Sequence, residues 1–201
     1  MTTAVHKIKI GPSHNGRKMP FDRFIVADFQ DGWLYELARG VIVVTDIPGI
    51  NHGRIVERLT ELFVLYNSSH RGLIQYRASG SECRLRLPGM RSDRHPDQAI
   101  YLDPPPEGDQ PWTSWVPHIV VEVVSKGGIK RDYVEKKEEY LRLGVREYWI
   151  IDPIKRRITI LNRAGDVWAE NPLTSRSVYR TELLPGLELR PAAILGPEVN
   201  P

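Results

Sequence analysis

The stretch His118-Ile119-Val120-Val121-Glu122-Val123-Val124-Ser125 is a nearly continuous apolar run, rich in β-branched residues. Such a run is typical of a strand that is buried on both faces of a sheet. One acid, Glu122, lies in its middle, and burying a carboxylate without compensation is costly or forces its protonation. A metal ion, a cation or a set of hydrogen-bond donors would compensate the charge. Alternatively, Glu122 faces solvent at a strand edge or forms a structural pair with an arginine.

The length of 201 residues suits a single domain with a good core. Hydrophobic residues make up 41% and charged residues 26%, as in an ordinary globular protein. We expect a flexible N-terminal arm over residues 1–24, one domain over residues 25–190 and a C-terminal tail over residues 191–201. No apolar window is long enough to span a bilayer, so no membrane partner is expected.

The N-terminal residues, the cysteine content and the net charge indicate the cellular location and the class of partner. The N-terminal residues lack the apolar core and cleavage site of a signal peptide. The single cysteine, Cys83, forms no internal disulfide, which favours a cytoplasmic location and argues against a cysteine-based zinc site. A net charge of +3 and a pI near 9.0 permit nucleic-acid binding without demanding it, because the basic residues are scattered.

The apolar patterns predict an α/β fold. Helical spacing indicates a helix over residues 52–67 with Asn51 as its N-cap, and a second helix over residues 131–143 that ends at Gly144. A hairpin is expected around Gly40, at a position that needs a positive φ. Further strands are expected at residues 73–76, 83–87, 99–102 and 145–152, with strand pairs within residues 158–168 and 178–189.

Two acids and a lysine form a candidate site. Asp97 precedes a short strand and Glu122 lies 25 residues later in the next one, so two carboxylates would converge on neighbouring strands. Their repulsion calls for a cation, and oxygen ligands select Mg²⁺ or Mn²⁺. Lys136 shares a helix face with Tyr133 and Tyr140, at positions i, i+3 and i+7. An inward lysine would suit phosphodiester hydrolysis, although its ammonium could instead reach out to water.

Several landmarks together resemble a known family. Pro96-Asp97 with Glu122-Val123-Val124-Ser125 is similar to the signature of the PD-(D/E)xK nuclease superfamily, except that Val124 stands where the lysine is expected. The wider pattern resembles the Uma-two family of restriction-endonuclease-like proteins, with Ser125-Lys126 in place of its serine-proline. The landmarks, in chain order, are Tyr35-Glu36-Leu37, Gly40, His52, Glu122-Val123-Val124-Ser125, Arg131-Asp132, Lys136, Tyr140, Gly144-Val145, Glu147-Tyr148-Trp149 and Asp152-Pro153.

This resemblance implies a restriction-endonuclease-like core, with a mixed central β-sheet flanked by helices and extra β-hairpins. It implies that the motif lysine has moved to the helix as Lys136. Asp97 and Glu122 would bind Mg²⁺ or Mn²⁺, with Glu36 as a further ligand. Lys136 would position the attacking water or stabilise developing charge. A catalytic role is also considered for His52, whose alternative is a helix cap or structural donor.

The expected partner is nucleic acid, with DNA favoured, and Arg131 and Lys126 are candidate phosphate contacts. A homodimer is expected, as is common for enzymes that cut both strands. One rival is a non-catalytic module that keeps the fold to bind nucleic acid or a protein partner. A second rival is a structural oligomer with a buried Glu–Lys pair. The residues leave strandedness and sequence specificity open.

Overall fold

The computed structural model describes residues 7–80, 83–108 and 111–197. The chain divides into two compact units where the sequence predicted one domain over residues 25–190. Unit 1 comprises Met1–Ile47 and Arg84–His95, and unit 2 comprises Pro48–Cys83 and Pro96–Pro201. Within the described ranges, no helix has both the length and the apolar character required to cross a membrane.

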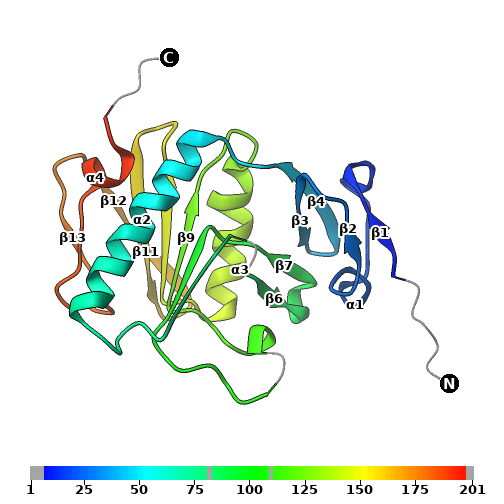
Figure 1. Ribbon diagram of the computed structural model, residues 1–201, viewed down its shortest axis with the longest axis horizontal. Coiled ribbons are helices and arrows are strands. Elements are labelled where there is room, and N and C mark those ends of the chain that lie inside the picture. The colour runs from blue at the N-terminus through cyan, green and yellow to red at the C-terminus, as the bar shows by residue number, and fades with distance from the viewer. Residues whose placement is uncertain (1–6, 81–82, 109–110, 198–201) are drawn as a thin grey trace. The chain divides into compact units, whose positions relative to one another are not determined.

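A mixed six-stranded sheet forms the centre of unit 2, as predicted. Its strands lie in the order β12-β11-β10-β9-β8-β5, and Figure 1 labels β12, β11 and β9 of this sheet. Only β9 and β10 run parallel, and the other neighbours are antiparallel. The bounds are β5 (Tyr76–Ser79), β8 (Gln98–Tyr101), β9 (Ile119–Val123), β10 (Glu147–Asp152), β11 (Arg157–Ala164) and β12 (Val167–Leu173).

Side chains along β9 alternate between the two faces of the sheet, and each face is covered by a different helix. Ile119, Val121 and Val123 join the core cluster that also contains Leu59 and Phe63 of α2 (Ile50–Ser69). Because successive strand residues point to opposite faces, Glu122 lies on the other face. That face is covered by η5 (Arg131–Glu135), a π turn, and by α3 (Lys136–Leu143).

The C-terminal segments pack on the core of unit 2. β13 (Tyr179–Arg180) pairs with β14 (Glu188–Leu189), and α4 (Pro191–Leu195) follows. Ile194 and Leu195 are buried in the cluster that contains α2. Residues 191–195 of the predicted C-terminal tail therefore form α4, whose apolar side chains pack into this core. Residues 198–201 lie outside the described part.

Unit 1 contains two small sheets. β4-β3-β7-β6 form one, and β1 pairs in parallel with β2 in the other. Within the N-terminal arm predicted over residues 1–24, Ile10 and Phe24 are fully buried and pack with Leu37 and Ile42. Residues 1–6 lie outside the described part. The bounds are β1 (Lys9–Ile10), η1 (Pro12–His14), α1 (Phe21–Phe24), β2 (Asp28–Phe29), β3 (Trp33–Ala38), β4 (Val41–Asp46), β6 (Leu85–Leu87), η3 (Pro88–Met90) and β7 (Ser92–Arg94).

Some predicted boundaries shift. The N-cap of α2 is Gly49, whose carbonyl accepts the Gly53 N–H, so Asn51 lies inside the first turn. The strand predicted at residues 73–76 begins at Tyr76, where pairing with β8 starts. The segment after Pro104 includes residues 109–110, which are not described. It leads into η4 (Pro111–Thr113), and the rings of Trp112 and Trp115 pack with Tyr101.

Candidate active site

Glu122 lies in the middle of β9 with its carboxylate enclosed by α3. Its Oε1 accepts hydrogen bonds from Lys136 Nζ at 2.9 Å and from the Tyr140 hydroxyl at 2.6 Å. The side chains of Glu122 and Lys136 are each 5% exposed. The lysine therefore does not extend to water, and it compensates the buried carboxylate directly. The two donors replace part of the hydration that the buried carboxylate has lost.

The π turn before α3 supplies a second acid. Asp132 Oδ1 lies 3.6 Å from Lys136 Nζ and its side chain is 6% exposed. The backbone carbonyl of Asp132 accepts a hydrogen bond from the Tyr148 hydroxyl of β10, which ties the turn to the sheet. Lys136 is thus placed between two carboxylates by a turn that is itself held in position.

Asp97 immediately precedes β8, the strand next to β9. Its Oδ2 accepts the backbone N–H of Val123 at 2.6 Å, and its Oδ1 lies 2.8 Å from His52 Nε2 on the first turn of α2. His52 Nδ1 is buried and finds no hydrogen-bond partner among the described residues. The structure therefore brings Asp97 together with His52, and fixes Asp97 to the residue that follows Glu122.

The pKa of the Cys83 thiol is affected by both Glu122 and Asp97. Burial raises its pKa well above the usual value, and the charges of Glu122 and Asp97 raise the pKa further. Lys136 and Arg77 act in the opposite direction. Cys83 is fully buried with Ala78 and Ala99. The two carboxylates consequently lie within electrostatic reach of one buried point.

A cavity of about 710 Å³ opens beside His52. Lys126 and Asn51 line it together with apolar side chains that include Val124, the residue that stands in the place of the motif lysine. Lys126 is exposed, as a phosphate contact would need to be. Arg131, the other predicted phosphate contact, lies in η5 and is half-buried.

Glu36 belongs to unit 1. It lies in β3, where its carboxylate accepts a hydrogen bond from Arg94 Nη1 at 3.2 Å and from the backbone N–H of His95 at 3.0 Å. The structure therefore shows Glu36 in a buried ion pair within that unit. In unit 2 the structure joins Asp97 to His52 and to the Val123 N–H, and it joins Glu122 to Lys136 and Tyr140.

Sequence reasoning missed three contributors to this site: Asp132, Tyr140 as a hydrogen-bond donor, and the N–H of Val123. The first two lie four residues before and after Lys136, so helical spacing could have identified them. The role of the Val123 N–H follows from the pairing of β8 with β9, which no local pattern specifies.

Carboxylate oxygens such as those of Asp97 and Glu122 are the kind of ligand that a hard divalent ion prefers. Among the described residues, no three His, Cys, Asp or Glu side chains gather closely enough to hold a metal by themselves. Mg²⁺ is commonly bound by one or two carboxylates together with waters and substrate phosphates. Asp97 and Glu122 present that number of carboxylates, and each carboxylate oxygen has two lone pairs, of which hydrogen bonds to Asp97 use one per oxygen.

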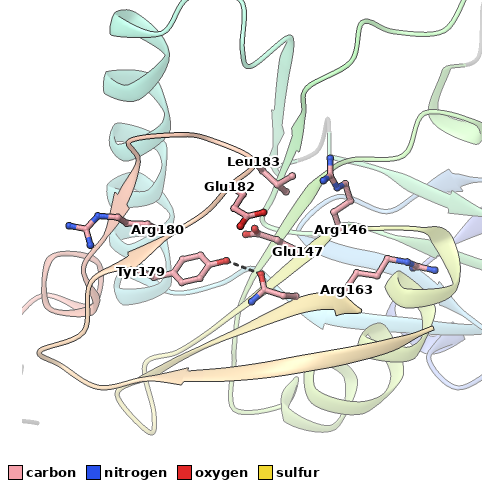
Figure 2. Close-up of a pocket in the computed structure, with 8 residues that line it drawn as sticks. Arg146, Glu147, Arg163, Tyr179, Arg180, Glu182 and Leu183 are labelled. Atoms are coloured by element: carbon pink, nitrogen blue, oxygen red, sulfur yellow. Dashed lines mark hydrogen bonds between the residues drawn. The ribbon is translucent and has the colours of Figure 1, made fainter. Parts of the chain in front are cut away.

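A second cavity of about 430 Å³ lies near the start of β10 (Figure 2). Glu147 and Glu182 point toward one another in it, and the Tyr179 hydroxyl donates to Asn162. Glu147 pairs with Ile119 at the beginning of β9, whereas Glu122 pairs with Ile150 farther along. This cavity is therefore separate from the Glu122 cluster.

Comparisons with known proteins identify the family and the fold. A family model named Uma2 and described as "Putative restriction endonuclease" matches residues 20–192. A solved structure described as a putative nuclease belonging to DUF820 from Anabaena variabilis matches with a TM-score of 0.68 and 14% identity, over 88% of this chain and 97% of that one. At that identity the likeness shows the fold. No curated protein matches the chain.

Proposed function

Because the chain belongs to the Uma2 family, whose model is described as "Putative restriction endonuclease", we propose that it is a metal-dependent nuclease. The reaction would be hydrolysis of a phosphodiester bond in nucleic acid. One observation carries the proposal: Asp97 lies directly before β8, Glu122 lies in the adjacent β9, and Lys136 of α3 contacts Glu122.

Asp97 and Glu122 would hold Mg²⁺ or Mn²⁺. When bound, the ion would neutralise charge on the scissile phosphate and favour ionisation of a water. Other residues of the chain hold these two carboxylates in place. The Val123 N–H and His52 fix the Asp97 carboxylate, and Tyr140 fixes that of Glu122.

Lys136 is the proposed catalytic cation. Its ammonium is held within 2.9 Å of Glu122 and 3.6 Å of Asp132, so it is positioned before any substrate arrives. A preorganised cation stabilises developing negative charge without reorganisation. His52 keeps its unpartnered Nδ1 for a proton or hydrogen bond, and Lys126 and Arg131 would contact phosphates.

DNA is the first substrate to test, and RNA the second. A homodimer would place two such sites on opposite strands of a duplex, and a cytoplasmic location would give access to nucleic acid. Both remain predictions of the sequence, and neither is needed for the chemistry of one site.

The test compares cleavage of DNA and RNA by the wild type and by Asp97→Asn, Glu122→Gln and Lys136→Met, with Mg²⁺, Mn²⁺ or EDTA. Removing a group that stabilises transition-state charge should lower the rate about 10²–10³-fold. Asp166→Asn is the matched control, because this acid is fully exposed at the β11–β12 turn. Folding of each variant is checked by thermal unfolding.

Calorimetry of metal binding distinguishes a metal-dependent nuclease from a non-catalytic binding module. Mg²⁺ binding by the wild type that disappears in Glu122→Gln would support the carboxylate site. A folded wild type that binds nucleic acid but cleaves neither substrate with either ion would contradict the proposal and favour a non-catalytic binding module.

A further inference from the structure

The positive charge of the protein is concentrated in unit 1. This unit carries ten Lys and Arg against six Asp and Glu, whereas unit 2 carries 18 against 19. The scattered distribution along the sequence hides this asymmetry, because unit 1 is assembled from two separate stretches. A basic surface attracts the phosphate backbone of nucleic acid irrespective of sequence.

Three of these cations line one cavity. It has a volume of about 530 Å³ and is bordered by Lys18, Arg39 and Arg91, which come from three different segments of unit 1. Asp22 is the only acid among the described residues that line it. All three cationic side chains are exposed. We call this site the basic cavity.

The backbone beneath two of the arginines is unusual. Arg39 has φ +50° and Arg91 has φ +51°, a region that side chains with a Cβ rarely adopt. Arg39 and Gly40 form the two-residue turn between β3 and β4, with positive φ at both positions. Such a turn favours Asn, Asp or Gly, so the fold by itself does not account for an arginine.

The same turn is fixed to Arg91. The Gly40 N–H donates to the Arg91 carbonyl at 2.8 Å, and the Arg39 N–H donates to Ser92 Oγ at 2.9 Å. The Arg91 guanidinium lies 3.8 Å from the position that a Cβ on Gly40 would occupy. These bonds fix the backbones of Arg39 and Arg91 near one another, and left-handed residues held in this way cluster at binding sites.

We propose that the basic cavity binds the phosphodiester backbone of the nucleic-acid substrate. This inference rests on the proposed function, and it adds a binding site for the substrate strand that lies outside the Glu122 cluster. Arginine suits this role because its guanidinium pairs with two phosphate oxygens at once. The site would carry no base preference, because it offers charge rather than groups shaped to base edges.

The test measures binding in EDTA, so that cleavage plays no part. Fluorescence anisotropy is recorded for a DNA oligonucleotide and an abasic oligonucleotide of equal length over a range of salt concentrations. The variant is Arg39→Asn with Arg91→Asn, since asparagine tolerates a positive φ. Arg156→Asn serves as the control, because Arg156 also has a positive φ, of +48°, and lies in unit 2.

Each lost phosphate contact lowers the slope of log K against log salt by about 0.7 for a single strand and 0.9 for a duplex. The double variant should therefore lose about 1.4–1.8 in slope, equally for both oligonucleotides, and should unfold at a temperature no lower than the wild type. Arg156→Asn should keep the wild-type slope.

An unchanged slope in the double variant, or a wild type that binds neither oligonucleotide at low salt, would overturn the basic cavity as a substrate site. A loss for the DNA oligonucleotide alone would also overturn it, since that result indicates base contacts. The cleavage assay with Glu122→Gln and Lys136→Met judges the proposed function separately, because those residues belong to unit 2.

Discussion

At the scale of single residues, the candidate site depends on the ion pair between Glu122 and Lys136. The buried carboxylate of Glu122 is stable because Lys136 and Tyr140 replace the water it has lost. Burial of the pair is by itself weak evidence for stability, since an apolar pair of similar volume is often as stable. What burial makes costly is the loss of one partner, because the other charge then remains without compensation.

Lys136→Met should lower the free energy of unfolding by about 3–5 kcal/mol, because it removes the ammonium that compensates the buried Glu122 carboxylate. Adding Glu122→Gln should recover most of that loss, since the amide is neutral and still accepts the Tyr140 hydroxyl. Urea unfolding at neutral pH measures both variants. A Lys136→Met cost below about 1 kcal/mol would show that Glu122 has another compensating group. If Lys136→Met with Glu122→Gln recovers the lost stability, this double variant is the preferred inactive form for binding studies.

At the scale of elements, the turn from η5 into α3 decides where the lysine lies. The helical stripe predicted that Lys136 shares a face with Tyr133 and Tyr140, and all three side chains do meet the sheet, at Glu122 and Asp152. The π turn over residues 131–135 was not predicted, because it adds one residue to a turn without any local signature. Such turns are frequent at functional sites.

The end of α3 gives a prediction about backbone conformation. Gly144 has φ +102°, and a Cβ there would meet Val116 only at an ordinary contact distance of 4.0 Å. Gly144→Ala should therefore cost about 1–2 kcal/mol of unfolding free energy from the left-handed conformation alone. Gly127→Ala is the control, because a Cβ there meets nothing within 4 Å and its φ is not positive. Equal effects of the two changes in thermal or urea unfolding would contradict this reason.

At the scale of the molecule, a buried acid joins distant segments of unit 2. Glu147 at the start of β10 accepts hydrogen bonds from Trp149 Nε1 and from Thr181, which follows β13. Burial raises the pKa of Glu147, and the hydrogen bonds from Thr181 and Trp149 oppose that rise only in part. The folded state thus holds the proton of this carboxyl more tightly than the unfolded chain does.

The stabilising contribution of Glu147 is present below its unfolded pKa and is lost as pH rises through the raised folded pKa. Glu147→Gln is neutral at every pH and should lack this loss. The difference in unfolding free energy between wild type and variant should accordingly move against the wild type as pH rises through that window. Urea unfolding at several pH values measures the difference. A difference that is constant with pH would contradict the raised pKa.

Local patterns were sufficient for much of this molecule. The apolar run at residues 118–125 determined a buried central strand, the spacing from residue 52 determined α2, and Gly144 determined where α3 ends. The position of Lys136 relative to Tyr140 likewise follows from helical geometry. These features depend on neighbours within a few residues, which is why the sequence by itself determined them.

Tertiary structure decided the rest. The partners of Asp97 are a histidine 45 residues before it and a backbone N–H 26 residues after it. Unit 1 joins residues 1–47 to 84–95, and only that assembly brings Lys18, Arg39 and Arg91 to one cavity. Packing also ordered residues 7–24 and 191–195, whose short segments carry no periodicity. Such features arise from strand pairing and burial between distant segments, and no local pattern encodes which segments will meet.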